Sequence, residues 1–100
     1  LEDAPVIEPP RGEMLRDTVA SLRLDCVLAS GMKTSRSRAA EIIRMGAVAV
    51  DHMPEERTDR ILAAGQLLSI RGFGRIRLID VGSPTRKDRL PVQLEIFHKG

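Results

Sequence analysis

Three cations and three hydroxyl groups occupy six consecutive positions in the first half of the chain: Lys33, Thr34, Ser35, Arg36, Ser37 and Arg38. Such side chains donate hydrogen bonds to phosphate oxygens, and the charged ones form the stronger bonds. A helix that begins here would add unpaired backbone N–H groups and the positive end of its dipole, which together attract anions. The segment therefore indicates a phosphate-binding site.

The same cations disfavour the isolated helix. A cation in the first turn costs roughly 0.3–1 kcal/mol at an exposed position, because the dipole is positive there. We therefore expect Arg36→Glu to leave the melting temperature unchanged or slightly higher while it weakens anion binding. Ser37, Glu41 and Arg44 share a stripe at 100° per residue, which extends the polar surface along the helix. The alternative interpretation is that these are solvated side chains and ordinary caps, since Arg and Lys are good helix formers.

Two short helices must position these residues. The first is predicted to have Ser21 as its N-cap and to stop at Gly31. The second is predicted to be capped by Thr34 or Ser35 and to end at Gly46. Its buried stripe consists of Ala39, Ile42 and Ile43. Helices this close together in the sequence must pack as a pair.

The hydrophobic period then changes from helical to two, which predicts strands. They are expected at residues 47–50, 66–70, 75–81 and 90–97, with a weaker candidate at residues 13–20. Gly72-Phe73-Gly74 predicts a hairpin, and residues 51–60 form a polar connection. The predicted fold class is α+β, with two short packed helices followed by a small, mostly antiparallel β-sheet. Residues 1–13 are expected to form a flexible, proline-rich arm, residues 14–97 the domain and residues 98–100 a tail.

Charge is distributed unevenly, although the formal net charge is only +2. Residues 33–44 carry four bases and one acid, and residues 71–89 carry six bases and two acids. Residues 1–20 and 51–60 instead carry an excess of acids. An anionic partner is expected to bind at the two basic stretches.

Several function classes are disfavoured by what the sequence lacks. Cys26 is the single cysteine, which excludes an internal disulfide, and His52 and His98 have no partners at metal-ligand spacing. Asp25 is expected to pair with a nearby arginine rather than to act in catalysis. No stretch approaches the roughly 18 apolar residues of a membrane span. We therefore expect no enzymatic activity, cofactor, metal, membrane partner or small-molecule substrate.

The aromatic content narrows the kind of anion. The chain has no Trp or Tyr, and its two phenylalanines are Phe73 and Phe97. Proteins that bind single strands usually stack bases on aromatic platforms, so this mode is disfavoured. DNA reading is also disfavoured, because the cations lie at a helix entrance and the outer helix face offers few base-reading side chains. The remaining interpretation is a surface that holds the phosphates of folded RNA.

A known RNA-binding family matches this pattern over residues 22–51, which read LRLDCVLASGMKTSRSRAAEIIRMGAVAVD. The matching positions are Arg23, Leu24, Asp25, Leu28, Ser35, Arg36, Ser37, Arg38, Ala39, Ile43, Gly46, Val48 and Val50. They resemble the S-four RNA-binding domain, whose two helices form the α-L motif. Residues 67–97 further resemble the C-terminal part of YlmH-type proteins, so the resemblance covers residues 14–97. The chain departs from the family pattern at Asp51-His52 and Gly65-Gln66, where other turn residues are common.

The resemblance implies where and what this chain binds. The main RNA surface would consist of Arg23, Lys33, Thr34, Ser35, Arg36, Ser37, Arg38 and Arg44. Arg71, Arg75, Arg86 and Lys87 are either second RNA contacts or ordinary turn residues. The implied target is structured RNA on the large ribosomal subunit, either ribosomal RNA or ribosome-bound tRNA. The implied setting is the rescue or quality control of stalled translation, and we expect a cytoplasmic monomer.

Two other functions stay open at this stage. The S-four fold is often attached to pseudouridine synthases, RNA methyltransferases and tRNA synthetases, so this chain could be the RNA-targeting accessory domain of an enzyme. Alternatively, the acidic residues 51–60 could bind another protein. The sequence upstream of Leu1 would separate the first alternative from the YlmH-type interpretation.

Overall fold

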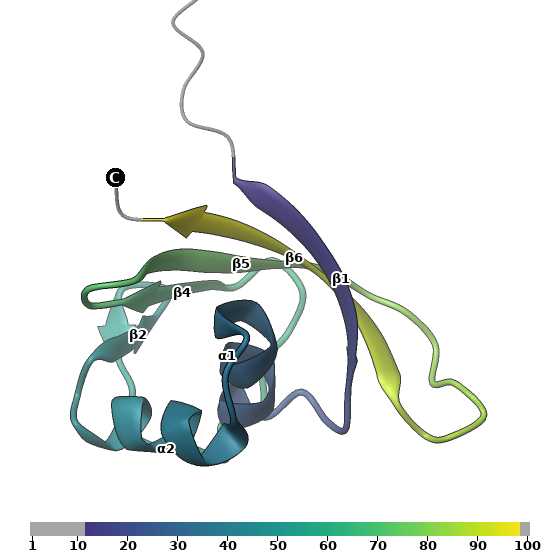
Figure 1. Cartoon of the computed structure of the whole chain (residues 1–100), viewed down its shortest axis with the longest axis horizontal. Coiled ribbons are helices and arrows are strands. Elements are labelled where there is room, and N and C mark those ends of the chain that lie inside the picture. Colours follow the sequence, from purple (N-terminus) through teal and green to yellow (C-terminus); the bar gives the residue numbers. More distant parts are fainter. Residues whose placement is uncertain (1–11, 99–100) are drawn as a thin grey trace, which may run out of the picture.

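One six-stranded antiparallel sheet and two helices make up residues 12–98, the part of the chain that the computed structural model describes (Figure 1). The elements are β1 (Glu13–Val19), α1 (Leu24–Met32), α2 (Arg36–Arg44), β2 (Val48–Val50), β3 (Met53–Pro54), β4 (Leu67–Ile70), β5 (Gly74–Val81) and β6 (Leu90–His98). The sheet order is β1-β6-β5-β4-β2-β3. The predicted α+β class is confirmed.

The two helices carry the chain from one edge of the sheet toward the other. β1 lies at one edge and β2 lies next to the opposite edge strand, so α1 and α2 cross the sheet between them. They cover one face, and no helix among residues 12–98 covers the other (Figure 1). β1 pairs with β6 from Glu13–Ile96 to Val19–Leu90, which confirms the weaker strand candidate.

Alternating apolar residues form the covered face of the sheet. Those buried on β2, β4, β5 and β6 are Val48, Val50, Leu68, Ile70, Ile76, Leu78, Val92, Leu94 and Ile96. Leu24 and Leu28 of α1 and Ile43 of α2 belong to the same core and are fully buried. The stripe predicted for α2 is confirmed. Burial of each large apolar side chain contributes roughly 1.5–3 kcal/mol, so this single layer holds both helices in place.

Gly31 does not end α1, contrary to the prediction. It lies inside the helix, and a Cβ at this position would be 2.6 Å from Cδ1 of the buried Ile76. The glycine is therefore needed for close approach of α1 to the sheet rather than for a turn. α1 ends at Met32 instead, and Lys33 takes the left-handed conformation that usually favours glycine.

Ser21 does not cap α1 either, because a segment distant in sequence accepts the hydrogen bonds of the N–H groups in the first turn of the helix. The N-cap is Arg23, whose side chain forms no capping hydrogen bond. The N–H of Leu24 donates to the carbonyl of Arg60 at 2.7 Å, and the N–H of Asp25 donates to the carbonyl of Thr58 at 3.2 Å. The predicted polar connection thus covers the start of α1. It also contains the short strand β3, which sequence analysis missed.

The remaining boundaries lie close to the predicted ones. β1 begins at Glu13, one residue before the expected domain boundary, and β6 continues to His98. Residues 1–11 of the predicted arm lie outside the described residues. β4 and β5 form the predicted hairpin, in which Gly72 has a φ of 83°. α2 ends before Gly46, which has a φ of 81°.

Candidate nucleic-acid interface

The α2 start (residues 33–38) combines exposed cations with unpaired backbone donors. Ser35, one of the two predicted caps, is the N-cap, and its Oγ accepts a hydrogen bond from the N–H of Arg38 at 3.0 Å. The N–H groups of Arg36 and Ser37 have no acceptor within residues 12–98. Two backbone donors at the positive end of the dipole are therefore available to an anion.

Lys33 occupies a strained position at this surface. Its φ of 55° and ψ of 47° place it in the left-handed region, which costs a non-glycine residue roughly 1–2 kcal/mol. Its side chain is exposed and forms no ion pair within residues 12–98. Arg38 is also exposed, and its Nη1 lies 3.2 Å from Oε1 of Glu41. An exposed pair of this kind contributes little to stability and leaves the guanidinium open to other acceptors.

Arg36 has a structural partner that sequence analysis did not assign to it. The Asp25 side chain is only 7% exposed and accepts hydrogen bonds from Nε and Nη2 of Arg23, at 3.2 and 3.1 Å. Nη2 of Arg36 lies 3.6 Å from the same carboxylate. The expected pairing of Asp25 with an arginine is confirmed. However, a buried carboxylate favours a cation nearby, so this contact predicts that Arg36→Glu destabilises the fold, opposite to the expectation from the helix dipole alone.

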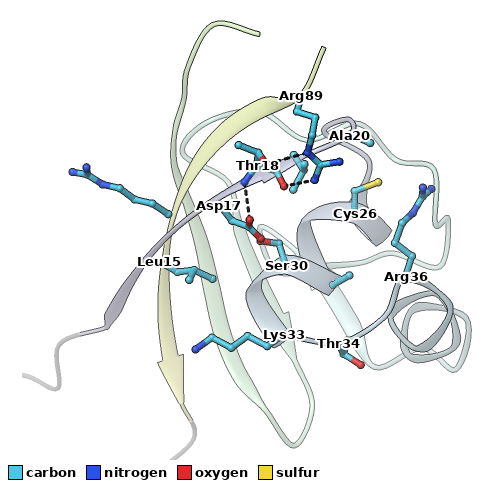
Figure 2. Close-up of a pocket in the computed structure, with 13 residues that line it drawn as sticks. Leu15, Asp17, Thr18, Ala20, Cys26, Ser30, Lys33, Thr34, Arg36 and Arg89 are labelled. Atoms are coloured by element: carbon cyan, nitrogen blue, oxygen red, sulfur yellow. Dashed lines mark hydrogen bonds between the residues drawn. The ribbon is translucent and has the colours of Figure 1, made fainter. Parts of the chain in front are cut away.

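A groove of about 590 Å³ separates β1 from α1 and reaches the α2 start (Figure 2). Its lining includes four cations, Arg16, Lys33, Arg36 and Arg89, and one acid, Asp17. Oδ2 of Asp17 accepts a hydrogen bond from the Ser30 hydroxyl at 2.6 Å. Thr34 also lines the groove, between Lys33 and Arg36 in sequence. The excess of cations makes the groove a continuation of the basic surface at the α2 start.

Arg89 is held in place across a large sequence separation. Its Nε donates to Oγ1 of Thr18 at 3.0 Å, and its Nη2 donates to the Thr18 carbonyl at 2.7 Å (Figure 2). Sequence analysis missed Arg16 and Arg89 as site residues. Arg16 lay in the weaker strand candidate, but nothing local indicates that residues 18 and 89 meet, because their contact depends on the pairing of β1 with β6.

The structure separates the other predicted residues from this surface. Arg44 is the last residue of α2, about 12 Å along the helix axis from Arg36 at a rise of 1.5 Å per residue. Arg86 and Lys87 are exposed in the β5–β6 loop and do not line the groove. Arg71 and Arg75 lie at the β4–β5 hairpin, next to a different hollow. Arg23, Lys33, Thr34, Ser35, Arg36, Ser37 and Arg38 therefore form the compact part of the predicted site.

The arginines of the β2–β4 connection are paired with acids beside them. Nη1 of Arg60 lies 2.8 Å from Oε1 of Glu55, and Nε of Arg57 lies 3.3 Å from Oδ1 of Asp59. The hydrogen bond from Arg60 lowers the pKa of Glu55 below its ordinary value, and the hydrogen bond from Arg57 lowers that of Asp59. These charges are internally compensated, so the connection is a poor site for an added anion.

Residues 12–98 show neither a metal site nor a membrane-spanning helix. They contain no group of three or more His, Cys, Asp or Glu side chains placed to hold a metal ion. Neither described helix is long and apolar enough to cross a membrane.

Comparison with known proteins gives one relevant likeness. No protein-family profile matches the chain. The chain is 42% identical over 83 residues to "Ribosome-associated protein quality control protein P2" of Bacillus subtilis (strain 168). The matched region covers 83% of this chain but 32% of that protein. The chain thus spans about a third of the length of this curated relative.

Proposed function

We propose that this chain is a non-catalytic RNA-binding module of a ribosome-associated quality-control protein, which holds structured ribosomal RNA or ribosome-bound tRNA on the large subunit. The α2 start and the adjoining groove are the RNA surface. Folded RNA presents closely spaced phosphates on a rigid shape, which suits a surface of cations and backbone donors with few aromatic residues.

The observation that carries this proposal is the arrangement of the α2 start. Lys33, Arg36 and Arg38 are exposed around two backbone N–H groups that have no acceptor in the described part of the chain, and the groove adds further cations. The strained backbone of Lys33 is better explained by a need for its charge than by stability. The name of the relative supports the ribosome as the setting, and with it a cytoplasmic location.

The proposal is tested by measuring the RNA affinity of variants that leave Asp25 and its partners Arg23 and Arg36 unchanged. Lys33→Gln with Arg38→Gln should weaken binding of ribosomal RNA fragments by roughly 1–3 kcal/mol, because two charge-assisted phosphate contacts are lost. Arg57→Gln with Arg60→Gln removes the same charge from the β2–β4 connection and is the matched control. Equal losses in both double variants would mean that only net charge matters and that the α2 start is not a site.

Salt dependence measures how many phosphates are contacted. With about four to six contacts, the logarithm of the association constant should fall with the logarithm of salt concentration at a slope of roughly −3 to −5. The double variant at Lys33 and Arg38 should reduce this slope by about 2. A slope near −1 for the unmodified chain contradicts the proposed surface.

The type of RNA provides a further test. Folded ribosomal RNA should bind more tightly than poly-U at equal salt, because the α2 start recognises phosphates held by a shape rather than stacked bases. Competition between the two RNAs for a labelled folded fragment measures the preference. Equal or better competition by poly-U contradicts recognition by shape.

A further inference from the structure

The face of the sheet that carries no helix has a hollow of about 800 Å³ next to the β4–β5 hairpin. One row of paired residues crosses it: Ala49 on β2, Ser69 on β4, Arg75 on β5 and Phe97 on β6. Because Ile70, Ile76 and Ile96 point into the core, this row lies on the opposite face. The hollow exists because the side chains of Ala49 and Ser69 are small, and Arg75 and Phe97 lie beside it.

Phe73, Phe97 and His98 lie at this end of the sheet. Phe97 and His98 both line the hollow. The His98 ring packs against Phe73, with ring centroids 5.2 Å apart and an interplanar angle of 59°. The scarcity of aromatic residues disfavoured base stacking at the sequence level, but the pairing of β6 with β5 places Phe97 beside a hollow lined by arginines.

The charge of the hollow is one-sided. Arg71, Arg75 and Arg77 line it, and the described lining includes no aspartate or glutamate. Nη1 of Arg77 donates to the carbonyl of Gly65 at 3.0 Å, which fixes this side chain. Arg71 and Arg75 are exposed and form no ion pair within residues 12–98. The hollow is therefore complementary to an anion, in contrast to the compensated β2–β4 connection.

We propose that this hollow binds an unpaired RNA nucleotide, with its base stacked on Phe97 and its phosphate held by Arg71 and Arg75. An aromatic face beside cations is the combination that serves single-stranded nucleic acid. The Ser69 hydroxyl supplies a hydrogen-bond partner for the sugar or base. This inference rests on the proposed function, in which the α2 start holds folded RNA. The helices and this hollow lie on opposite sides of the sheet, so the two surfaces contact different segments of RNA (Figure 1).

A tailed RNA hairpin tests the hollow separately from the α2 start. The affinity of the full chain is measured by fluorescence anisotropy for a hairpin with a four-nucleotide unpaired 3′ tail and for the same hairpin without it. The tail should increase the affinity of the unmodified chain at least about fivefold. Phe97→Leu, which keeps an apolar strand residue, and Arg75→Gln should each remove most of this gain and leave the affinity for the tailless hairpin within about twofold.

Two controls separate failure of this inference from failure of the proposed function. Arg57→Gln should keep the gain from the tail, because Arg57 does not line the hollow and is paired with Asp59. Lys33→Gln with Arg38→Gln should weaken binding of both hairpins and keep the ratio between them. If that double variant has no effect while the gain depends on Phe97 and Arg75, the proposed function fails and the nucleotide site stands.

Other occupants of the hollow give different results, each of which overturns the inference. One such result is an equal affinity for tailed and tailless hairpins, and another is a tail gain that survives both Phe97→Leu and Arg75→Gln. Competition by a polyglutamate peptide as strong as that by the tail indicates an acidic polypeptide instead. A dimer in sedimentation that Phe97→Leu dissociates indicates a second copy of this chain.

Discussion

The α2 start and the β2–β4 connection are both rich in arginine, but they differ in where the matching acids lie. In the connection, Arg57 and Arg60 each pair with an acid a few residues away, and the charges cancel locally. At the α2 start, Arg36 reaches a buried acid on another helix, and Lys33 has no ion pair within the described range. The positions of acids in space, rather than the number of arginines, therefore decide which segment can hold an anion.

The largest expected effect comes from reversing the charge that α2 presents to Asp25. Arg36→Glu should lower the free energy of unfolding by about 1–2 kcal/mol, because it replaces a cation near a buried carboxylate with a second carboxylate. The expected loss is smaller than for a fully buried pair, because the Arg36 side chain is 55% exposed. Denaturant titration measures the change. Arg57→Glu is the matched control and should change stability by less than about 0.5 kcal/mol. Equal effects would remove the distinction between the two regions.

A second change should separate RNA binding from stability at the α2 start. Lys33→Gly removes a cation and supplies the residue that tolerates a φ of 55°. RNA affinity should fall by about 1 kcal/mol, while the free energy of unfolding should stay the same or rise by up to about 1 kcal/mol. Anisotropy and thermal unfolding on the same samples check both values. A clear loss of stability would mean that the Lys33 side chain has a structural role.

The smallest expected effect concerns the compensated connection in acid. Because the pKa of Glu55 is lowered in the folded chain, the stability that this group contributes is present above its unfolded pKa. It is lost as the pH falls from the ordinary pKa of a glutamate, about 4.3, through the lower, folded pKa. Arg60→Gln should therefore lower stability by a few tenths of a kcal/mol at pH 7 and flatten the decline in acid. Unfolding curves between pH 7 and pH 3 test this; an unchanged pH profile contradicts a role for the pair.

Local patterns predicted most of the fold and the residues that lie together at the α2 start. The stripe on α2 predicted which of its residues are buried, and Ser35 was one of the two residues predicted as its cap. The errors occurred where a distant segment replaced a local partner. The backbone carbonyls at residues 58–60 made a cap at Ser21 unnecessary. The close approach of Ile76 explains why residue 31 is a glycine inside the helix. Arg16 and Arg89 joined the groove through strand pairing, which the sequence pattern did not reveal.

The pairing of the first strand with the last also sets the order in which the molecule can be completed during its own synthesis. α1, α2 and the β4–β5 hairpin involve near neighbours in the chain, so they can form while translation continues. β1 is made early, yet its partner β6 begins only at Leu90. Until that strand leaves the ribosome, β1 and β5 each lack a neighbour, and the groove beside the α2 start lacks Arg89. The proposed RNA surface is therefore finished only when nearly the whole domain has been translated.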